Sequence, residues 1–219
     1  MKSSKALCLL SGGMDSAVTA FIAAQNHDVS TIFFRYGQPT EAKELNCFRE
    51  LSRTLGAENS IIVDLPFYRR LGGSALTDDT IAIPDHEDEG IPPTYVPFRN
   101  GIMLSIASAH AEVLGIDNLF IGAVWEYSSG YPDCREEFLQ AMERAIDLGT
   151  GPEFRPKINF PVIDMTKSQI IKRGMELSVP FEHTWSCYSA EDRPCGVCPS
   201  CRLRLRAFQQ TGLTDPLMR

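Results

Sequence analysis

Positions 5–16 read KALCLLSGGMDS, an apolar run that stops abruptly at a serine and two glycines. A short, continuous apolar run bounded by a turn is typical of a strand buried in a parallel sheet. The residues that follow, 16–25, have the composition of a helix. We therefore predict a strand joined to a helix by a glycine turn, which is the first unit of an α/β fold.

The same alternation of strand and helix signals continues over the first two thirds of the chain. Further strands are predicted at 29–36, 60–65, 118–124 and 158–163, and further helices at 41–55, 100–114, 134–148 and from Thr166 onward. Thr166 and Gln169 form a capping-box pattern, which marks a helix start. Strands separated by helices of this length favour a parallel sheet covered on both faces. We expect a doubly wound α/β fold around a mostly parallel five-stranded sheet.

Two segments break this alternation. Residues 72–97 are rich in Asp, Glu and Pro, and a loop of this length in a compact domain is more often functional than idle. The second segment begins at Trp185 and is rich in cysteine. We expect an α/β domain at residues 1–180 and a metal-binding C-terminal segment at residues 181–219 that packs on it.

The composition of the 219 residues excludes several classes of protein. Hydrophobic residues make up 43% and charged residues 22%, as in ordinary globular domains, which excludes a disordered or collagen-like chain. The net charge is 21 − 28 = −7, so nucleic-acid binding through phosphate neutralisation is not expected. No apolar run is long enough for a signal peptide or a membrane helix, so we expect a cytoplasmic protein without a membrane partner.

The turn from Ser11 to Ser16 has the features of an anion site. The first N–H groups of a helix have no intrahelical partner, and glycines let backbone amides approach an anion closely. Ser11 and Ser16 carry hydroxyls that can donate to phosphate oxygens. Asp15 would repel a phosphate, so it makes sense only with a divalent cation between the two. The alternative is a tight βα turn with an N-cap serine.

Four of the seven cysteines form a C-x7-C-x2-C-x2-C pattern at Cys187, Cys195, Cys198 and Cys201. Two successive Cys-x-x-Cys steps and one upstream thiolate can close a tetrahedral four-sulfur site. We predict one structural Zn²⁺ per chain, because a closed four-thiolate site suits zinc, with an iron–sulfur cluster as the competing interpretation. This zinc knuckle would hold the C-terminal segment beside the active site.

Five stretches together resemble the 7-cyano-7-deazaguanine synthase (QueC) family of N-type ATP pyrophosphatases. They are the turn at 11–16, Tyr-Gly-Gln at 36–38, Thr-Tyr-Val-Pro followed by Arg-Asn within 94–100, Gly-Tyr-Pro-Asp-Cys-Arg at 130–135, and Thr-Trp-Ser-Cys-Tyr at 184–188 with the cysteines that follow. The resemblance spans nearly the whole chain. It implies an adenine nucleotide α-hydrolase-like fold with a C-terminal zinc knuckle, and a homodimer.

The resemblance also implies a reaction, that of an ATP-dependent carbon–nitrogen ligase. Such an enzyme adenylates the carboxylate of 7-carboxy-7-deazaguanine with MgATP, releases pyrophosphate and couples the acyl group to ammonia. A second adenylation and an elimination give the nitrile, a precursor of queuosine in tRNA. ATP, Mg²⁺, the deazaguanine carboxylate and ammonia are therefore the expected ligands.

The match assigns site residues to this reaction. The pyrophosphate of ATP and its Mg²⁺ would be held by Ser11, Gly12, Gly13, Asp15 and Ser16. Arg99 and Lys167 join Asp15 as catalytic candidates. Arg99 would brace the transferring phosphate or the substrate carboxylate, and Lys167 would bind the leaving pyrophosphate. The alternatives are a surface ion pair for Arg99 and a solvated first-turn position for Lys167.

The deazaguanine is expected to be recognised by the segment before and within 130–135. Asp133 can accept from the ring N–H and the exocyclic amino group together, and Glu126 is the next carboxylate in line. Tyr131 or Tyr127 would stack on the flat heterocycle. The alternative for Asp133 is an N-cap of the helix predicted to start at Cys134.

Four departures from the family pattern leave a second function open. Pro39 and Thr40 replace an arginine and a histidine, Phe98 replaces a glycine, one extra residue lies within 126–129, and Pro199 replaces an aspartate. The lost arginine and histidine remove two candidates for charge stabilisation or proton transfer, and Phe98 adds bulk beside Arg99. The runner-up is a QueC-like defence-associated enzyme that stops at the amide, or that transfers the activated deazaguanine to an amine of a partner protein.

A third interpretation, from a different class, is a nucleic-acid-binding zinc module without catalysis. It would rest on a local basic cluster of Arg193, Arg202, Arg204 and Arg206. The intact Asp15 and the net charge of −7 argue against it, so no direct nucleic-acid binding is expected.

Overall fold

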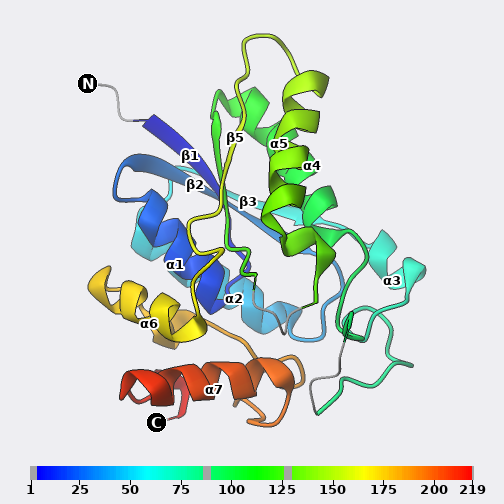
Figure 1. Cartoon of the computed structure of the whole chain (residues 1–219), viewed down its shortest axis with the longest axis vertical. Helices are drawn as coiled ribbons and strands as arrows, with labels where there is room; N and C mark the ends of the chain where they lie inside the picture. The colour runs from blue at the N-terminus through cyan, green and yellow to red at the C-terminus, as the bar shows by residue number, and fades with distance from the viewer. Residues whose placement is uncertain (1–3, 86–89, 126–129, 219) are drawn as a thin grey trace.

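The computed structural model of the chain describes residues 4–85, 90–125 and 130–218, which contain a five-stranded sheet. The strands are β1 (Ser4–Leu9), β2 (His27–Arg35), β3 (Ser60–Asp64), β4 (Asn118–Ile121) and β5 (Lys157–Asn159). Their spatial order is β3-β2-β1-β4-β5, and all the pairings are parallel. Figure 1 shows helices on both sides of this sheet, which confirms the predicted doubly wound α/β fold.

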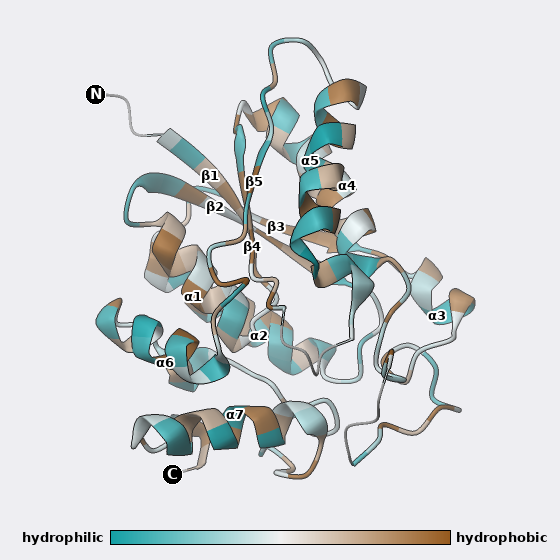
Figure 2. Ribbon diagram, in the orientation of Figure 1, coloured by the Kyte–Doolittle hydropathy of each residue, from teal (hydrophilic) through white to brown (hydrophobic). Residues whose placement is uncertain are grey.

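Alternate residues of the central strands β1, β2 and β4 enter opposite layers of the core. One layer is formed by α1 (Met14–Ala23), α2 (Glu41–Leu55), α6 (Lys167–Glu176) and α7 (Pro199–Thr211). The other is formed by α3 (Phe67–Leu71), α4 (Arg99–Leu114) and α5 (Glu136–Gly149). From β1, Ala6 and Cys8 face the first layer, and Leu7 and Leu9 face the second. Figure 2 shows apolar residues along the strands, as a sheet buried on both faces requires.

Short 3₁₀ turns and caps connect these elements. The turns are η1 (Pro132–Cys134), η2 (Phe181–His183) and η3 (Pro216–Met218). The predicted capping box at Thr166 is confirmed, because its hydroxyl accepts from the Gln169 backbone N–H and its own N–H donates to the Gln169 side chain at 2.8 Å. Satisfying these N–H groups starts α6 immediately after Thr166.

The boundaries differ from the sequence predictions. Helix α1 begins two residues early, at Met14, and the strand predicted to reach 163 ends at Asn159. Helix α4 buries Leu104, Ala107 and Ala111 against the sheet. Met103 and Leu114 flank that face. A helix rich in alanine has a weak apolar periodicity, so the side that faces the sheet is poorly marked.

Helix α4 starts from a residue with unusual backbone geometry. Phe98 has φ 53° and ψ 29°, which is the left-handed region. This conformation explains why a glycine is expected at the position, since a Cβ is disfavoured there. The Phe98 ring lies over Gly101, where an added Cβ would be 2.5 Å from Cζ, and makes an edge contact with Phe138. Phe98 does not line the cavity described below, so its bulk lies outside that space.

The order of the strands creates a crevice between β1 and β4. The chain winds outward from β1 through β2 to β3 and then crosses to β4 on the other side of β1. Ligands of open α/β sheets bind at such a switch point, outside the carboxyl ends of the strands. The glycine turn at 11–16 follows β1 and therefore lies at this position.

No helix in the described residues is long and apolar enough to cross a membrane. The division at residue 181 stays a prediction, although α7 packs on the α1–α2–α6 side of the sheet and adds Ala207 and Phe208 to that core.

Candidate active site and metal centre

A cavity of about 340 Å³ lies at the carboxyl edge of the sheet. Its walls come from the turn after β1, the end of β2, the start of α4, the start of α6 and the C-terminal segment. The predicted residues Ser11, Asp15, Arg99, Tyr131 and Lys167 all line it. The structure thus gathers residues from separate stretches of the sequence around one space.

The turn after β1 is held open by its own hydroxyls. Ser11 Oγ and Ser16 Oγ are 3.0 Å apart, and the Gly13 N–H donates to Ser11 Oγ over 3.3 Å. Gly12 has φ 79°, and a Cβ there would lie 2.6 Å from the Glu44 carbonyl oxygen. Only glycine fits this combination of conformation and close packing. The first amides of α1 therefore face the cavity at the positive end of the helix dipole.

Gly122 is a residue of the cavity wall that the sequence analysis missed. It follows β4 directly and lines the cavity. A Cβ at Gly122 would lie 2.7 Å from both N and Cα of Ser16, so β4 and the start of α1 touch backbone to backbone. A glycine after a predicted strand was the available signal, but strand prediction extended through it to residue 124.

Asp15 and Lys167 form an ion pair in the wall of the cavity. Lys167 Nζ donates to Asp15 Oδ2 at 2.6 Å, and both side chains are largely buried. Asp15 Oδ1 is buried and has no hydrogen-bond partner among the described residues. A buried carboxylate oxygen without a partner suits a divalent cation, whose preferred ligands are oxygens. The proximity of Asp15 and Lys167 shows that Lys167 is not simply a solvated first-turn residue.

Arg99 is the second cation of the cavity. Its Nη1 donates to the Tyr36 hydroxyl at 2.9 Å, and its guanidinium carbon lies 5.4 Å from the Tyr36 ring centre. Burial raises the pKa of Tyr36 to about 12, so that phenol stays neutral. Within the described residues no carboxylate forms a salt bridge with Arg99, so the surface ion pair considered above is not found there.

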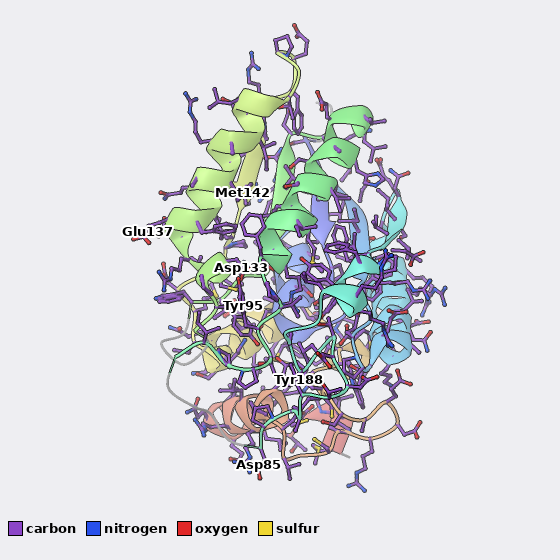
Figure 3. The ribbon with its side chains drawn as sticks, turned by 90° about the vertical axis from the view of Figure 1, so that its right-hand side faces the viewer. Asp85, Tyr95, Asp133, Glu137, Met142 and Tyr188 are labelled. Atoms are coloured by element: carbon purple, nitrogen blue, oxygen red, sulfur yellow. The ribbon has the colours of Figure 1, made fainter. Side chains whose placement is uncertain are left out.

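Asp133 has a different neighbourhood from the one predicted. It is 3% exposed, and its Oδ2 accepts from the Asn100 backbone N–H at 2.9 Å, in the first turn of α4. The cap predicted for a helix starting at Cys134 is wrong, because α5 begins at Glu136 and Asp133 caps α4 instead. Figure 3 shows Asp133 where the lower ends of α4 and α5 meet. Its carboxylate is not part of the cavity wall, whereas Asn100, Tyr131 and Cys134 are.

The other predicted residues of this segment have mixed outcomes. The Tyr131 hydroxyl lies 2.8 Å from the Thr94 hydroxyl, which fixes its ring in the cavity wall. Burial raises the pKa of Cys134 to about 11, so its thiol is protonated and unsuited to a nucleophilic role. Glu126 and Tyr127 lie outside the described residues.

Thr40, one of the departures from the family pattern, is hydrogen-bonded to Glu44, a carboxylate that the sequence analysis missed. Pro39 is exposed, whereas the Thr40 hydroxyl lies 3.0 Å from Glu44 Oε1 and 3.1 Å from the Cys187 carbonyl oxygen. Gln38 Nε2 donates to Glu44 Oε2 at 3.1 Å. Glu44 lines the cavity, and burial raises its pKa to about 7. It lies shortly beyond Tyr-Gly-Gln, where the sequence marks it only as part of the α2 pattern.

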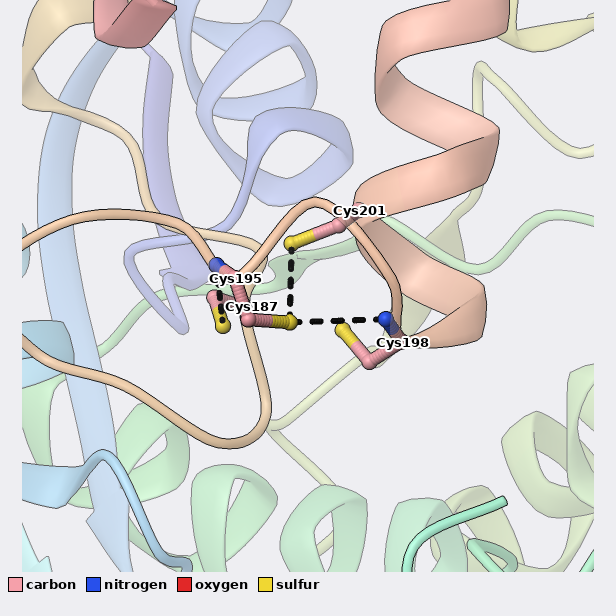
Figure 4. A group of neighbouring side chains, drawn as sticks. All are labelled: Cys187, Cys195, Cys198 and Cys201. Carbon is pink, nitrogen blue, oxygen red and sulfur yellow. Dashed lines mark hydrogen bonds between the residues drawn. The ribbon is translucent and has the colours of Figure 1, made fainter. Parts of the chain in front are cut away.

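The four clustered cysteines form a group beside this cavity that could hold a metal ion. All four Sγ atoms lie within 4.8 Å of one another, and Cys195 Sγ is 3.9 Å from Cys201 Sγ. A tetrahedral zinc with Zn–S bonds of about 2.3 Å requires sulfurs about 3.8 Å apart. Figure 4 shows the thiols converging from the loop and from the start of α7. Backbone N–H groups of Ser189 and Cys195 point at Cys187 Sγ, both at 3.4 Å, as suits a thiolate.

The segment that carries the four cysteines is joined directly to the glycine turn. The Trp185 N–H donates to the Gly12 carbonyl oxygen at 2.8 Å. Arg204, which the sequence suggested as part of a basic surface cluster, is 3% exposed and pairs with Asp215 at 2.7 Å. It also donates to Thr184 Oγ1 at 2.7 Å, so it fastens α7 to this segment. The cluster is therefore reduced to exposed Arg193, Arg202 and Arg206, which weakens the nucleic-acid interpretation.

Comparisons with known proteins agree with this geometry. A family model described as "Queuosine biosynthesis protein QueC" matches residues 5–212. The 7-cyano-7-deazaguanine synthase of a Sulfurovum species is 53% identical over 215 residues, which cover 97% of each chain. That of a Nitratiruptor species is 52% identical, again over 97% of each chain.

A solved structure shares the fold at low sequence identity. A 4-thiouridine synthetase in complex with RNA and bound ATP gives a TM-score of 0.56 at 20% identity. The match covers 95% of this chain and 50% of that chain, so the chain corresponds to about half of that protein.

Proposed function

The chain belongs to the QueC family of queuosine biosynthesis proteins, and from this membership we propose that it is a 7-cyano-7-deazaguanine synthase. The observation in the structure that carries the proposal is Asp15. One of its oxygens is paired with Lys167 and the other is buried without a partner, in a glycine turn at the carboxyl edge of the sheet. The full-length relatives do not favour the runner-up, transfer to a partner-protein amine.

The site suits an ATP-dependent ligase that forms AMP and pyrophosphate. The amides at the start of α1 and the hydroxyls of Ser11 and Ser16 would bind the β- and γ-phosphates of ATP. Asp15 would hold Mg²⁺ through the oxygen that lacks a partner, and the ion would neutralise phosphate charge. Lys167 supplies a second positive charge on the same side of the cavity, where pyrophosphate leaves.

Arg99 is suited to the substrate carboxylate and the α-phosphate that it attacks. Its guanidinium is oriented by Tyr36, and no salt bridge within the described residues competes for its charge. It can hold the carboxylate against repulsion by the phosphate, which is the main barrier to forming an acyl-adenylate. Ammonia would then displace AMP to give the amide, and a second activation would give the nitrile.

Tyr131 and Asp133 are the candidates for recognising the heterocycle. Tyr131 offers an aromatic face in the cavity wall. We keep Asp133 as the candidate for the donor edge of the base because its neighbours Tyr131 and Cys134 line the cavity, although one of its oxygens already caps α4.

The cysteine cluster is proposed to hold one structural zinc per chain. Four crowded thiols without an open position suit a closed tetrahedral site and leave no room for a metal-bound substrate. Its contribution would be to folding, since it fixes the segment whose Trp185 N–H contacts the glycine turn. The homodimer implied by the family is kept as part of the proposal.

The test is a reaction with ATP, Mg²⁺, 7-carboxy-7-deazaguanine and an ammonium salt. We expect release of pyrophosphate and AMP that depends on the deazaguanine, and formation of the nitrile by mass spectrometry. Omitting ammonium should leave pyrophosphate release in the first turnover and remove the nitrile. Absence of pyrophosphate from metal-loaded, folded protein would contradict the proposal, and a deazaguanine label on protein would restore the runner-up.

A further inference from the structure

Two carboxylates line the cavity within the described residues, and Glu44 is the second of them after Asp15. The described lining residues include no histidine, and Asp15 is already paired with Lys167. The phenol of Tyr36 and the thiol of Cys134 have pKa values raised by burial to about 12 and about 11. Neither changes charge near neutral pH, and the guanidinium of Arg99 is permanently charged. Glu44 is therefore well suited to take up and release a proton in this wall.

The hydrogen bonds around Glu44 provide for both of its protonation states. The Thr40 hydroxyl has one hydrogen but stands within bonding distance of two acceptors, Glu44 Oε1 at 3.0 Å and the Cys187 carbonyl at 3.1 Å. When Glu44 is ionised, Thr40 donates to it, and the Cys187 carbonyl loses that donor. When Glu44 is protonated, it donates to Thr40, and Thr40 donates to Cys187. Gln38 donates to Glu44 Oε2 in either state.

The charges around Glu44 oppose one another. Burial favours the neutral acid, while donation by Gln38 and Thr40 and the nearby charge of Arg99 favour the carboxylate. Its place in the first turn of α2 favours the carboxylate as well. The other titratable groups facing it are Glu41 and Cys47 on the same helix, α2, and Tyr36 directly after β2. The balance leaves the two states close in free energy near neutral pH.

We propose that Glu44 accepts the proton that the attacking nitrogen must release when ammonia displaces AMP from the acyl-adenylate. This rests on the proposed function. The nitrogen lone pair forms the C–N bond, and the C–O bond to AMP breaks with its electrons on the phosphate oxygen. One N–H proton passes to the Glu44 carboxylate while its bonding pair stays on nitrogen. The products are the neutral amide, AMP and protonated Glu44, which completes the hydrogen-bonded chain to Thr40 and Cys187.

This assignment explains why the arginine and histidine after Tyr-Gly-Gln are dispensable here. Position 39 faces solvent, so Pro39 removes nothing from the cavity. Position 40 is buried, and Thr40 supports Glu44 instead of acting on the substrate itself. The proton-transfer group is supplied from the first turn of the helix that follows.

Glu44→Gln tests the proposal because the amide resembles the protonated acid and keeps partners for Gln38 and Thr40. Two steps are measured separately, pyrophosphate release in the first turnover without ammonium, and amide formation when ammonium is added. We expect the first to stay at the parent rate, since adenylation of a carboxylate needs no proton acceptor. Amide formation should fall by about 10²–10⁴-fold, and its rate divided by the concentration of free NH₃ should no longer rise with pH through neutrality. Glu41→Gln, a neighbouring carboxylate outside the cavity, is the control.

The outcomes separate this inference from the proposed function. If the parent protein releases no pyrophosphate, the proposed function fails before Glu44 is tested. If both steps fall equally in Glu44→Gln, or if neither changes, Glu44 is not the proton acceptor. Glu44→Asp provides a second variant if the glutamine protein does not fold. It should recover part of the amide-forming rate and retain a pH-dependent limb, and a flat pH profile would contradict the proposal.

Discussion

Replacing Gly122 by alanine should damage both stability and catalysis, although the change adds one methyl group. The new Cβ would lie 2.7 Å from N and Cα of Ser16 and 2.8 Å from the carbonyl carbon of Asp15. Ordinary contacts begin at 3.4 Å, so β4 and the start of α1 must separate by about 0.7 Å. Overpacking against rigid backbone costs about 1–3 kcal/mol of unfolding free energy.

The same displacement moves the turn that is proposed to bind pyrophosphate. A misplacement of about 1 Å in a catalytic group costs on the order of 10²-fold in rate, so a large loss in the rate of pyrophosphate release is expected. Unfolding by denaturant gives the stability, and a coupled pyrophosphate assay gives the rate. Gly149→Ala is the matched control, because a Cβ there meets nothing within 4 Å and alanine is preferred in a helix.

Gly101→Ala tests whether the cost of the added methyl group depends on which atom obstructs it. By distance alone it looks worse, since its Cβ would be 2.5 Å from Cζ of Phe98. That atom is the end of a ring that is 49% exposed, so the ring can swing aside and lose only its contact with Phe138. We therefore expect Gly101→Ala to be milder than Gly122→Ala in both measurements. The opposite order would show that the identity of the obstructing atom does not govern the cost.

Asp15→Asn should reduce pyrophosphate release by about 10²–10³-fold with the fold intact by circular dichroism, and a parent rate would reject Asp15 as the cation ligand. Cys198→Ser should lose the bound metal and lower stability, because a structural metal contributes to folding; elemental analysis of the parent chain decides between zinc and iron with sulfide. Asp133→Asn keeps an oxygen that can accept from the Asn100 N–H, so the melting temperature of the variant should stay near that of the parent. Calorimetry should show weaker binding of the deazaguanine and unchanged binding of ATP. Equal weakening of both ligands would mean that Asp133 only caps α4. The pKa of Glu44 is raised from 4.5 to about 7 in the fold, so its contribution favours folding below pH 4.5 and is lost as the pH rises through 7. Glu44→Gln should therefore lose less stability than the parent over that range, by at most about 3 kcal/mol, and identical pH profiles of stability would contradict the shift.

The elements of the fold were predictable because their signals are local. Apolar runs, turn glycines and the Thr166 capping box act within a few residues, and they indicate the strands, most helices and the parallel sheet. The short helix α3 was not predicted, because five residues are too few to show a helical periodicity.

The site was predictable where one stretch of sequence carries the chemistry. The cysteines and the glycine turn are recognisable by their spacing, and Arg99 and Lys167 followed from the family pattern. Glu44 and Gly122 were missed because their roles depend on contacts between separate segments, Glu44 with the cavity and Gly122 with Ser16. Asp133 shows the converse, since its motif suggested a ligand while its carboxylate reaches the first turn of a helix 33 residues earlier.

The hydrogen bond from the Trp185 N–H to the Gly12 carbonyl has a consequence for the order in which the molecule assembles. It joins two distant parts of the chain, and contacts between such residues form late because loop closure must come first. A growing chain can pair β1, β2 and β4 long before residue 185 exists. The turn proposed to bind phosphate therefore acquires its last support only when the cysteine segment docks. If that segment needs its metal to fold, a shortage of metal should leave chains with an ordered sheet and no enzyme activity.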